Sequence, residues 1–147
     1  MKSQIEILVH ATENKYKIIS SIIQTLSIST EFNEIEYEGH WGNKILRLIA
    51  EIKKKDTQHL LTNILGSLSY INKQNILSNL ENHIDQKGNI YIRLDKQKLC
   101  TKTISITEID GIKIKFKPNK NLLIQAKKSN KINQEIYMLY RRLLESS

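Results

Sequence analysis

The chain has 147 residues, of which 39% are hydrophobic and 26% are charged, as in an ordinary globular protein. This composition excludes wholesale disorder, a collagen and a disulfide scaffold, and no apolar run is long enough to span a bilayer. A chain of this length buries about 70% of its unfolded surface. We therefore expect residues 1–147 to form a single domain with a hydrophobic core.

The N-terminus and the cysteine content predict the compartment. Residues 1–10 lack the basic stretch, the apolar stretch and the small-residue cleavage site of a secretory signal. Cys100 is the sole cysteine of the sequence, which fits a reducing environment. We expect a cytoplasmic protein that makes no membrane contact.

Excess positive charge is concentrated in one stretch of the chain. The formal net charge is +8 at pH 7, from 23 basic and 15 acidic residues. Residues 87–128 hold 11 basic and 3 acidic residues, so the whole excess lies there. A localised basic field attracts polyanions, of which nucleic acid is the usual one. The alternative is that these lysines keep an exposed edge of a sheet soluble.

The first half of the chain shows strand and helix patterns in turn. Residues 4–10 alternate apolar and polar side chains and predict a strand. Apolar residues then recur at helical spacing over 13–27, behind Thr12 as the N-cap. Residues 33–38 and 44–53 predict two further strands.

The second strand carries an acidic row. Ile35 and Tyr37 alternate with Glu34, Glu36 and Glu38, and we expect the glutamates to form the outer face. In the third strand the apolar residues from position 46 to 52 face inward, and two isoleucines occupy its other face. A helix capped by Asp56 or Thr57 and a shorter helix over about 73–84 follow.

The basic third of the chain is predicted to be mostly strand. Its predicted strands are 90–95, 104–106 and 112–117. Asp110-Gly111 is a hairpin turn signal. The apolar phase shifts ahead of this turn, so we expect a β-bulge at Thr107-Glu108 or a wider loop. A terminal helix is predicted over about 130–145.

This order of elements predicts an α+β domain built on a largely antiparallel sheet, with helices covering one face. The other face then carries the alternate side chains Tyr91, Arg93, Lys102, Ser105, Lys113, Lys115 and Lys117. Sheets that bind RNA place lysine and arginine on phosphates and stack rings on unpaired bases. Alternatively, Tyr91 is simply a tyrosine at the margin of the sheet.

Three stretches of the sequence resemble a family of small archaeal proteins described as RNA-binding, exosome-associated domains. They are residues 10–13 (HATE), 38–43 (EGHWGN) and 90–97 (IYIRLDKQ). Their order and spacing match over most of residues 1–117. The resemblance implies a fold like that of ribosomal protein L5 and a role in RNA processing or decay. The loop of relatives commonly continues with proline, where Lys44 stands here.

The loop between the second and third strands holds the sole tryptophan between two glycines. Gly39 and Gly42 allow a tight turn that keeps His40-Trp41 at the end of a strand. An exposed Trp41 is a base-stacking platform or a protein contact, and the alternative is a ring folded back on the core. His40 and Asn43 hydrogen-bond bases, phosphates or the backbone of the loop itself.

The stretch from Arg93 to Gln97 offers polar side chains of three kinds. Arg93 presents a planar fork for phosphate or guanine, and Lys96 supplies a point charge. We interpret Asp95 as orienting one of these cations. Gln97 reads a base edge or makes a hydrogen bond within its loop.

Catalysis and metal binding have little support in the sequence. Cys100 has no histidine close in sequence and no flanking motif of a nucleophile. Glu36, Glu38 and His40 share an alternation that would suit a metal ion, although an acidic outer row usually faces water. The sequence has no glycine-rich phosphate loop and no paired cysteines. We expect no enzyme activity, no cofactor and no bound metal.

We therefore predict a non-catalytic RNA-binding protein, accessory to RNA processing or decay. The candidate RNA-contacting residues are Tyr91, Arg93, Lys96, Gln97, Lys102, Lys113, Lys115, Lys117, His40, Trp41, Asn43 and Lys44. The alternative is an assembly module that homodimerises or docks a partner through the sheet face. In that case acidic and basic strands pair between copies.

Overall fold

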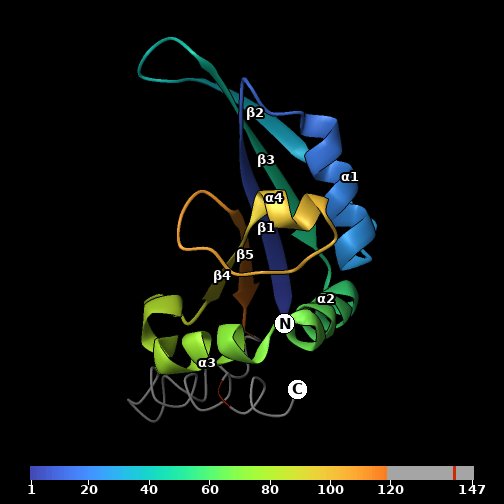
Figure 1. Ribbon diagram of the computed structural model, residues 1–147, viewed down its shortest axis with the longest axis vertical. Helices are drawn as coiled ribbons and strands as arrows, with labels where there is room; N and C mark the ends of the chain where they lie inside the picture. The colour runs from blue at the N-terminus through green and yellow to red at the C-terminus, as the bar shows by residue number, and fades with distance from the viewer. Residues whose placement is uncertain (119–140, 142–147) are drawn as a thin grey trace.

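The structure is a computed structural model that describes residues 1–118 and residue 141 (Figure 1). The terminal helix predicted over about 130–145 lies outside the described residues, except for residue 141. Within the described part of the chain, no helix is both long and apolar enough to cross a membrane.

Five strands, four α-helices and one short 3-10 helix make up the part of the chain that is described. In chain order they are β1 (Lys2–His10), α1 (Lys15–Leu26), β2 (Asn33–Glu38), β3 (Lys44–Ile52), α2 (Lys54–Ser67), α3 (Tyr70–Ser78), η1 (Leu80–His83), β4 (Ile90–Leu94), α4 (Lys96–Cys100) and β5 (Ile112–Lys117).

The strands form one antiparallel sheet in the order β2-β3-β1-β5-β4. β1 lies at the centre and pairs with β3 on one side and with β5 on the other. This confirms the predicted α+β class and the antiparallel sheet. The closer likeness to ribosomal protein L5 stays a prediction.

One face of the sheet carries the helices and the core. Ile5, Ile7 and Val9 of β1 are at most 2% exposed, and α1 packs Ile22 and Leu26 against this face. Figure 1 shows α1 and α2 along one side of the sheet, with α4 lying across it next to α1. The side chains at the alternate positions of each strand point to the second face of the sheet, which we call the open face.

The first helix begins later than predicted. Asn14, rather than Thr12, is its N-cap, because the Asn14 side chain accepts from the backbone N–H groups of Tyr16 and Lys17 at 3.1 and 3.2 Å. Glu13 lies outside the helix, where its carboxylate accepts from a backbone N–H of β1. Local propensity did not distinguish between two neighbouring capping residues.

The caps predicted for α2 and the single helix predicted after it are also wrong. α2 begins after Lys53, and Thr57 lies in its first turns, where its hydroxyl makes a 2.7 Å hydrogen bond with Ser3 of β1. Ser69 caps α3 by accepting from the N–H of Asn72. The single helix predicted over about 73–84 is therefore two elements, α3 and η1.

The register of β2 reverses the faces expected for this strand. Ile35 lies opposite Arg47 of β3, whose side chain is on the open face, so Ile35 and Tyr37 point there too. The three glutamates of β2 lie on the helix-bearing face, and Glu34 is 2.7 Å from Lys15 of α1. All six residues of β2 are exposed because it is an edge strand. The prediction of an outer acidic row opposite two inward apolar residues was wrong.

The segment between β4 and β5 differs most from the prediction. Asp95 caps α4 by accepting from the N–H of Lys98 at 2.9 Å, instead of orienting a neighbouring cation. Residues 104–106 form a single bridge, between Leu94 and Ile106, and not a strand. Asp110-Gly111 is therefore no hairpin turn. The wider loop, one of the two forms expected, spans residues 107–111.

Candidate nucleic-acid interface

Alternate residues of three strands gather cations on the open face. The lysines of β5 point there because the apolar residues between them are buried in the core. The register adds Arg93 and Tyr91 from β4 and Lys2 from β1. We call Lys2, Arg93, Lys113, Lys115 and Lys117 the cationic rows. Lys2 was not predicted as a site residue, because the first strand was expected to begin at residue 4 and β1 begins at Lys2.

Like charges lie directly opposite each other within the cationic rows. Arg93 pairs with Lys113 across β4 and β5, and Lys2 pairs with Lys117 across β1 and β5. Like charges at such positions destabilise a sheet. Lys117 is 3.9 Å from the Glu51 carboxylate, but no salt bridge within the described residues reaches the cationic rows on β4 or elsewhere on β5. A polyanion would supply the missing counter-charge.

Two of these lysines cover the ring of Tyr91. The Nζ atoms of Lys113 and Lys115 lie 4.6 and 5.8 Å from the ring centroid. The hydroxyl donates to Asp85 at 2.9 Å, and burial together with this hydrogen bond raises the pKa of Tyr91. The ring therefore positions the lysines through cation–π contacts and leaves little of its surface free for a base.

An ion pair lies between the cationic rows and the rest of the open face. Nε of Arg47 donates to Glu6 at 2.9 Å, and this hydrogen bond raises the pKa of Arg47. A hollow of about 230 Å³ opens beside it, lined by Gln4, Glu6, Arg47, Tyr91, Lys113 and Lys115. Three cations and one carboxylate line this hollow, a balance of charge that suits a phosphate group.

Beyond the ion pair, the open face becomes apolar. Leu8, Ile35 and Tyr37 are 40–43% exposed, and Ile45 and Ile49 of β3 are half-buried on the same face. We call Leu8, Ile35, Tyr37, Ile45 and Ile49 the apolar half. The guanidinium of Arg47 is 3.4 Å from the Tyr37 hydroxyl, so it borders both parts of the open face.

The loop of the β2–β3 hairpin presents the tryptophan to solvent. Trp41 is 88% exposed and packs edge-to-face against His40, with 5.0 Å between the ring centroids. The Gly39 N–H donates to the Asn43 carbonyl at 2.6 Å, and Gly42 has a φ of 76°. Figure 1 shows this hairpin projecting past β1 and α1. The interpretation that folds Trp41 back on the core is wrong.

Lys96, a candidate RNA contact in the sequence, is instead buried in an internal network. Its Nζ donates to the Leu8 carbonyl at 2.9 Å and to Glu13 at 3.1 Å, and lies 3.5 Å from Asp110. His10 is 3.0 Å from the other oxygen of Asp110. We call His10, Glu13, Lys96 and Asp110 the clasp. It ties α4 and the 107–111 loop to the end of β1.

The clasp also lowers the pKa of the Asp110 carboxylate. Burial raises the pKa of Asp110, but the hydrogen bond from His10 and the charge of Lys96 outweigh burial and hold this pKa below its ordinary value. The carboxylate is therefore ionised where the network needs a negative charge. Side chains from the first and third resembling stretches thus meet inside the protein.

The other predicted site residues lie away from the cationic rows. Lys102 follows α4 with a φ of 63° and lies outside the strands, so it is not one of the alternate side chains of the sheet. Gln97 is exposed on α4, and the Ser105 hydroxyl is 3.5 Å from Asn72 of α3. Lys44 stands beside the hairpin loop, 3.9 Å from Glu36. The described part of the chain contains no cluster of three side chains suited to a metal ion.

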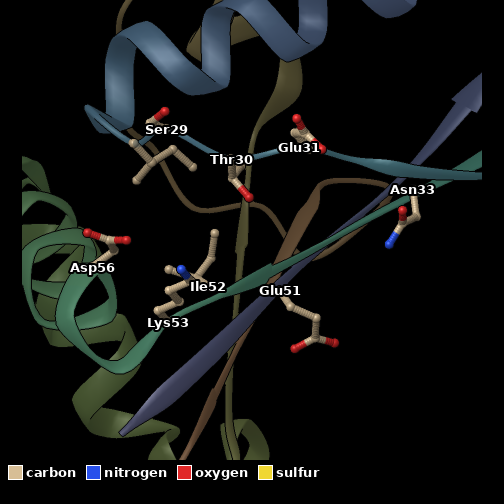
Figure 2. Close-up of a pocket in the computed structure, with 9 residues that line it drawn as sticks. Ser29, Thr30, Glu31, Asn33, Glu51, Ile52, Lys53 and Asp56 are labelled. Atoms are coloured by element: carbon tan, nitrogen blue, oxygen red, sulfur yellow. The ribbon is translucent and has the colours of Figure 1, made fainter.

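A larger hollow, of about 480 Å³, lies near the start of α2 (Figure 2). It is lined by Ile28, Ser29, Thr30, Glu31, Asn33, Glu51, Ile52, Lys53 and Asp56. Figure 2 shows Lys53 and Asp56 at the start of α2, across from Ser29 and Thr30 of the segment before β2. Three carboxylates and one ammonium line it, which is a poor match for a polyanion.

The fold and the cationic open face define a small α+β protein of the nucleic-acid-binding kind, and comparison with known proteins gives the family. A family model described as RNA binding matches residues 3–118. Over 116 residues the chain is 35% identical to RNA-binding protein PAB1135 from Pyrococcus abyssi, covering 74% of this chain and 75% of that protein. The chain therefore belongs to this RNA-binding family.

Two solved structures share the fold with detectable sequence identity. Protein AF2318 from Archaeoglobus fulgidus matches with a TM-score of 0.76 and 28% identity, over 97% of each chain. Protein SSO0741 from Sulfolobus solfataricus matches with a TM-score of 0.71 and 26% identity, over 91% of this chain and 99% of that one. Both are described as DUF54 proteins.

Proposed function

We propose that this protein binds RNA through the cationic rows of its open face. The observation that carries the proposal is the placement of like charges directly opposite each other, Arg93 with Lys113 and Lys2 with Lys117. Such pairs weaken the sheet unless a polyanion lies over them. The family description and the name of the Pyrococcus abyssi relative favour RNA among polyanions.

The geometry favours contacts to the RNA backbone. Lysines two residues apart on β5 are about 7 Å apart along the strand, and each ammonium is a point charge that accepts any phosphate orientation. Arg93 adds a planar fork at the edge strand β4. Contacts of this kind hold nucleic acid without reading its sequence.

The proposed test compares two triple variants by fluorescence anisotropy with a labelled, unstructured RNA. One variant is Lys113→Glu/Lys115→Glu/Lys117→Glu, on the open face. The matched control is Lys17→Glu/Lys55→Glu/Lys98→Glu, whose exposed lysines lie on α1, α2 and α4. Both variants change the net charge equally. We expect the open-face variant to lose at least tenfold in affinity and the control to lose far less.

A salt series separates electrostatic binding from other kinds. The cationic rows and Arg47 offer six cations, and six phosphate contacts give a log–log salt slope of about −4 for a single strand. We expect the open-face variant to lose about 2 units of this slope. Equal losses for the two variants, or a slope near zero for the wild type, would show that the open face is not the RNA site.

We further propose a non-catalytic, cytoplasmic role accessory to RNA processing or decay, in association with an exosome. The resemblance of residues 10–13, 38–43 and 90–97 to exosome-associated domains supports this role. Gel filtration with a purified exosome core tests the association, and we expect the two to co-elute. Separate elution, or cleavage of RNA by the purified chain alone, would contradict the role.

A homodimer in which acidic and basic strands pair between copies has less support. The register places the glutamates of β2 on the helix-bearing face and the lysines of β5 on the open face. We therefore expect light scattering to give the mass of a monomer across a salt series. A dimer that dissociates as salt rises would favour the assembly alternative.

A further inference from the structure

The apolar half of the open face is continuous with the cationic rows. Ile49, Glu6 and Lys113 occupy one row across β3, β1 and β5. The next row towards the hairpin loop contains Ile35, Arg47 and Leu8, and Tyr37 and Ile45 follow in the row after that. A ligand held by the cationic rows that extends towards the hairpin loop must therefore cross the apolar half.

Aromatic rings become more exposed from the cationic rows towards the hairpin loop. The Tyr91 ring lies under two ammonium groups. The Tyr37 side chain is 43% exposed in the apolar half, and Trp41 is 88% exposed in the loop beyond it. From the row of Lys113 to the start of β3 at Lys44 the distance along the strand is about 17 Å, the length of five strand residues, and Trp41 lies in the loop beyond.

We propose that unpaired nucleotides of a single RNA strand lie over the apolar half and that a base stacks on Trp41. The inference rests on the function proposed above and specifies the class of RNA. In a duplex the faces of the bases are hidden in the stack, so a duplex would set phosphates against Leu8, Ile35 and Ile45. A single strand offers base faces to apolar and aromatic side chains while its phosphates remain near cations.

The charge around the apolar half agrees with this occupant. Arg47 borders it on the side of the cationic rows, whereas Lys44, at the base of the hairpin loop, shares the helix-bearing face with Glu36. The glutamates of β2 point to the opposite face, away from the path of the strand. A chain of phosphates therefore meets a cation, Arg47, where it passes from the cationic rows to the apolar half.

Trp41 itself reports on the inference, because it is the one tryptophan in the sequence. Unlabelled single-stranded RNA of about 15 nucleotides is added to the wild-type protein while tryptophan emission is followed. We expect the emission to be quenched and Trp41 to be shielded from acrylamide as the RNA saturates. Unchanged emission at saturation, established with labelled RNA, would overturn the inference.

A variant pair with matched exposure supplies the second test. Tyr37→Ala/Trp41→Ala removes one exposed ring of the apolar half and one of the hairpin loop, whereas Tyr16→Ala/Tyr70→Ala removes exposed tyrosines of α1 and α3. Affinities are measured for a single-stranded RNA and for a duplex RNA of equal length. We expect the first variant to lose at least tenfold in affinity for the single strand, with an unchanged salt slope. We expect the control to match the wild type on both RNAs.

The outcomes distinguish this inference from the proposed function. If Tyr37→Ala/Trp41→Ala binds the single strand normally and the open-face lysine variant does not, the apolar half is no RNA site, although the cationic rows are. Equal losses on single strand and duplex would also overturn the inference. If neither variant weakens RNA binding, the proposed function fails as well. Thermal melting of each variant checks that the fold is intact.

Discussion

Two cations from the basic third of the chain, Lys96 and Arg93, lie in opposite environments. Lys96 is 7% exposed and has three oxygen partners within 3.5 Å in the clasp. Arg93, three residues earlier, is exposed on an edge strand and lies opposite Lys113. The first cation stabilises the fold and is not free for a ligand. The second is held at a cost to the sheet and is free to meet a polyanion.

Residues of the three resembling stretches have structural roles as well as places on the candidate surface. His10, Glu13 and Lys96 come from two of these stretches, and all three belong to the clasp. Asp95, from the third stretch, caps α4. The lysines of β5, which belong to none of them, make up most of the cationic rows. Several residues that define the resemblance therefore hold the scaffold, whereas Arg93 and Trp41 of the same stretches lie at the candidate RNA-contacting surfaces.

The largest effect is expected when the clasp loses its cation. Lys96→Ala takes a buried ammonium away from the Glu13 carboxylate and the Leu8 carbonyl, and Glu13 keeps its hydrogen bond from the His10 N–H. We expect the free energy of unfolding to fall by about 3 kcal/mol, measured by urea denaturation. Lys98→Ala, at an exposed position of the same helix, is expected to stay within about 0.5 kcal/mol of wild type. Equal losses of stability for Lys96→Ala and Lys98→Ala would show that the clasp does not stabilise the fold.

A pair of glycines tests the packing of the loop that the clasp holds. A Cβ at Gly111 would lie 2.6 Å from the Leu94 carbonyl oxygen and 2.6 Å from the Thr107 methyl group. We expect Gly111→Ala to destabilise the protein by about 2 kcal/mol. Gly66→Ala in α2, where a Cβ meets nothing within 4 Å, is expected to stabilise it by about 0.5 kcal/mol. Thermal melting that shows the same sign for both would contradict this packing.

Acid is expected to weaken the clasp by a smaller amount. The pKa of Asp110 is depressed in the folded state, so its contribution is present above the unfolded pKa and is lost as pH falls through the folded one. Because this side chain is 51% exposed, the contribution is at most about 0.5 kcal/mol. Asp110→Asn should therefore be slightly less stable than wild type at pH 7 and equal to it near pH 2. A gap that widens in acid would reverse the assigned sign.

The sheet was predictable from the sequence because each strand has its own local signal. Alternation gave β1, β2, β3, β4 and β5 within a few residues, and their order with the helices predicted the α+β class. The faces of β2 were not predictable in this way. Ile35 and Tyr37 alternate as core residues do, but pairing with β3 sets their direction, and pairing is a long-range property.

The candidate site was predictable only in part, for a related reason. Alternation placed Lys113, Lys115 and Lys117 on one face, but the opposition of Arg93 and Lys113 depends on the register of two strands joined by a long segment. The partners of Lys96 lie 14, 83 and 88 residues away in sequence, so its burial left no local signal. Nothing near Trp41 in the sequence distinguished an exposed ring from a buried one.

The most direct test of the central claim measures stability and RNA affinity on one substitution, Arg93→Glu. This change replaces a like-charge pair with an ion pair to Lys113. We predict that the free energy of unfolding rises by about 0.5 kcal/mol while RNA affinity falls at least fivefold. Opposite signs would show that the cationic rows serve a polyanion at the expense of the fold. A loss of stability with unchanged RNA affinity would contradict the account.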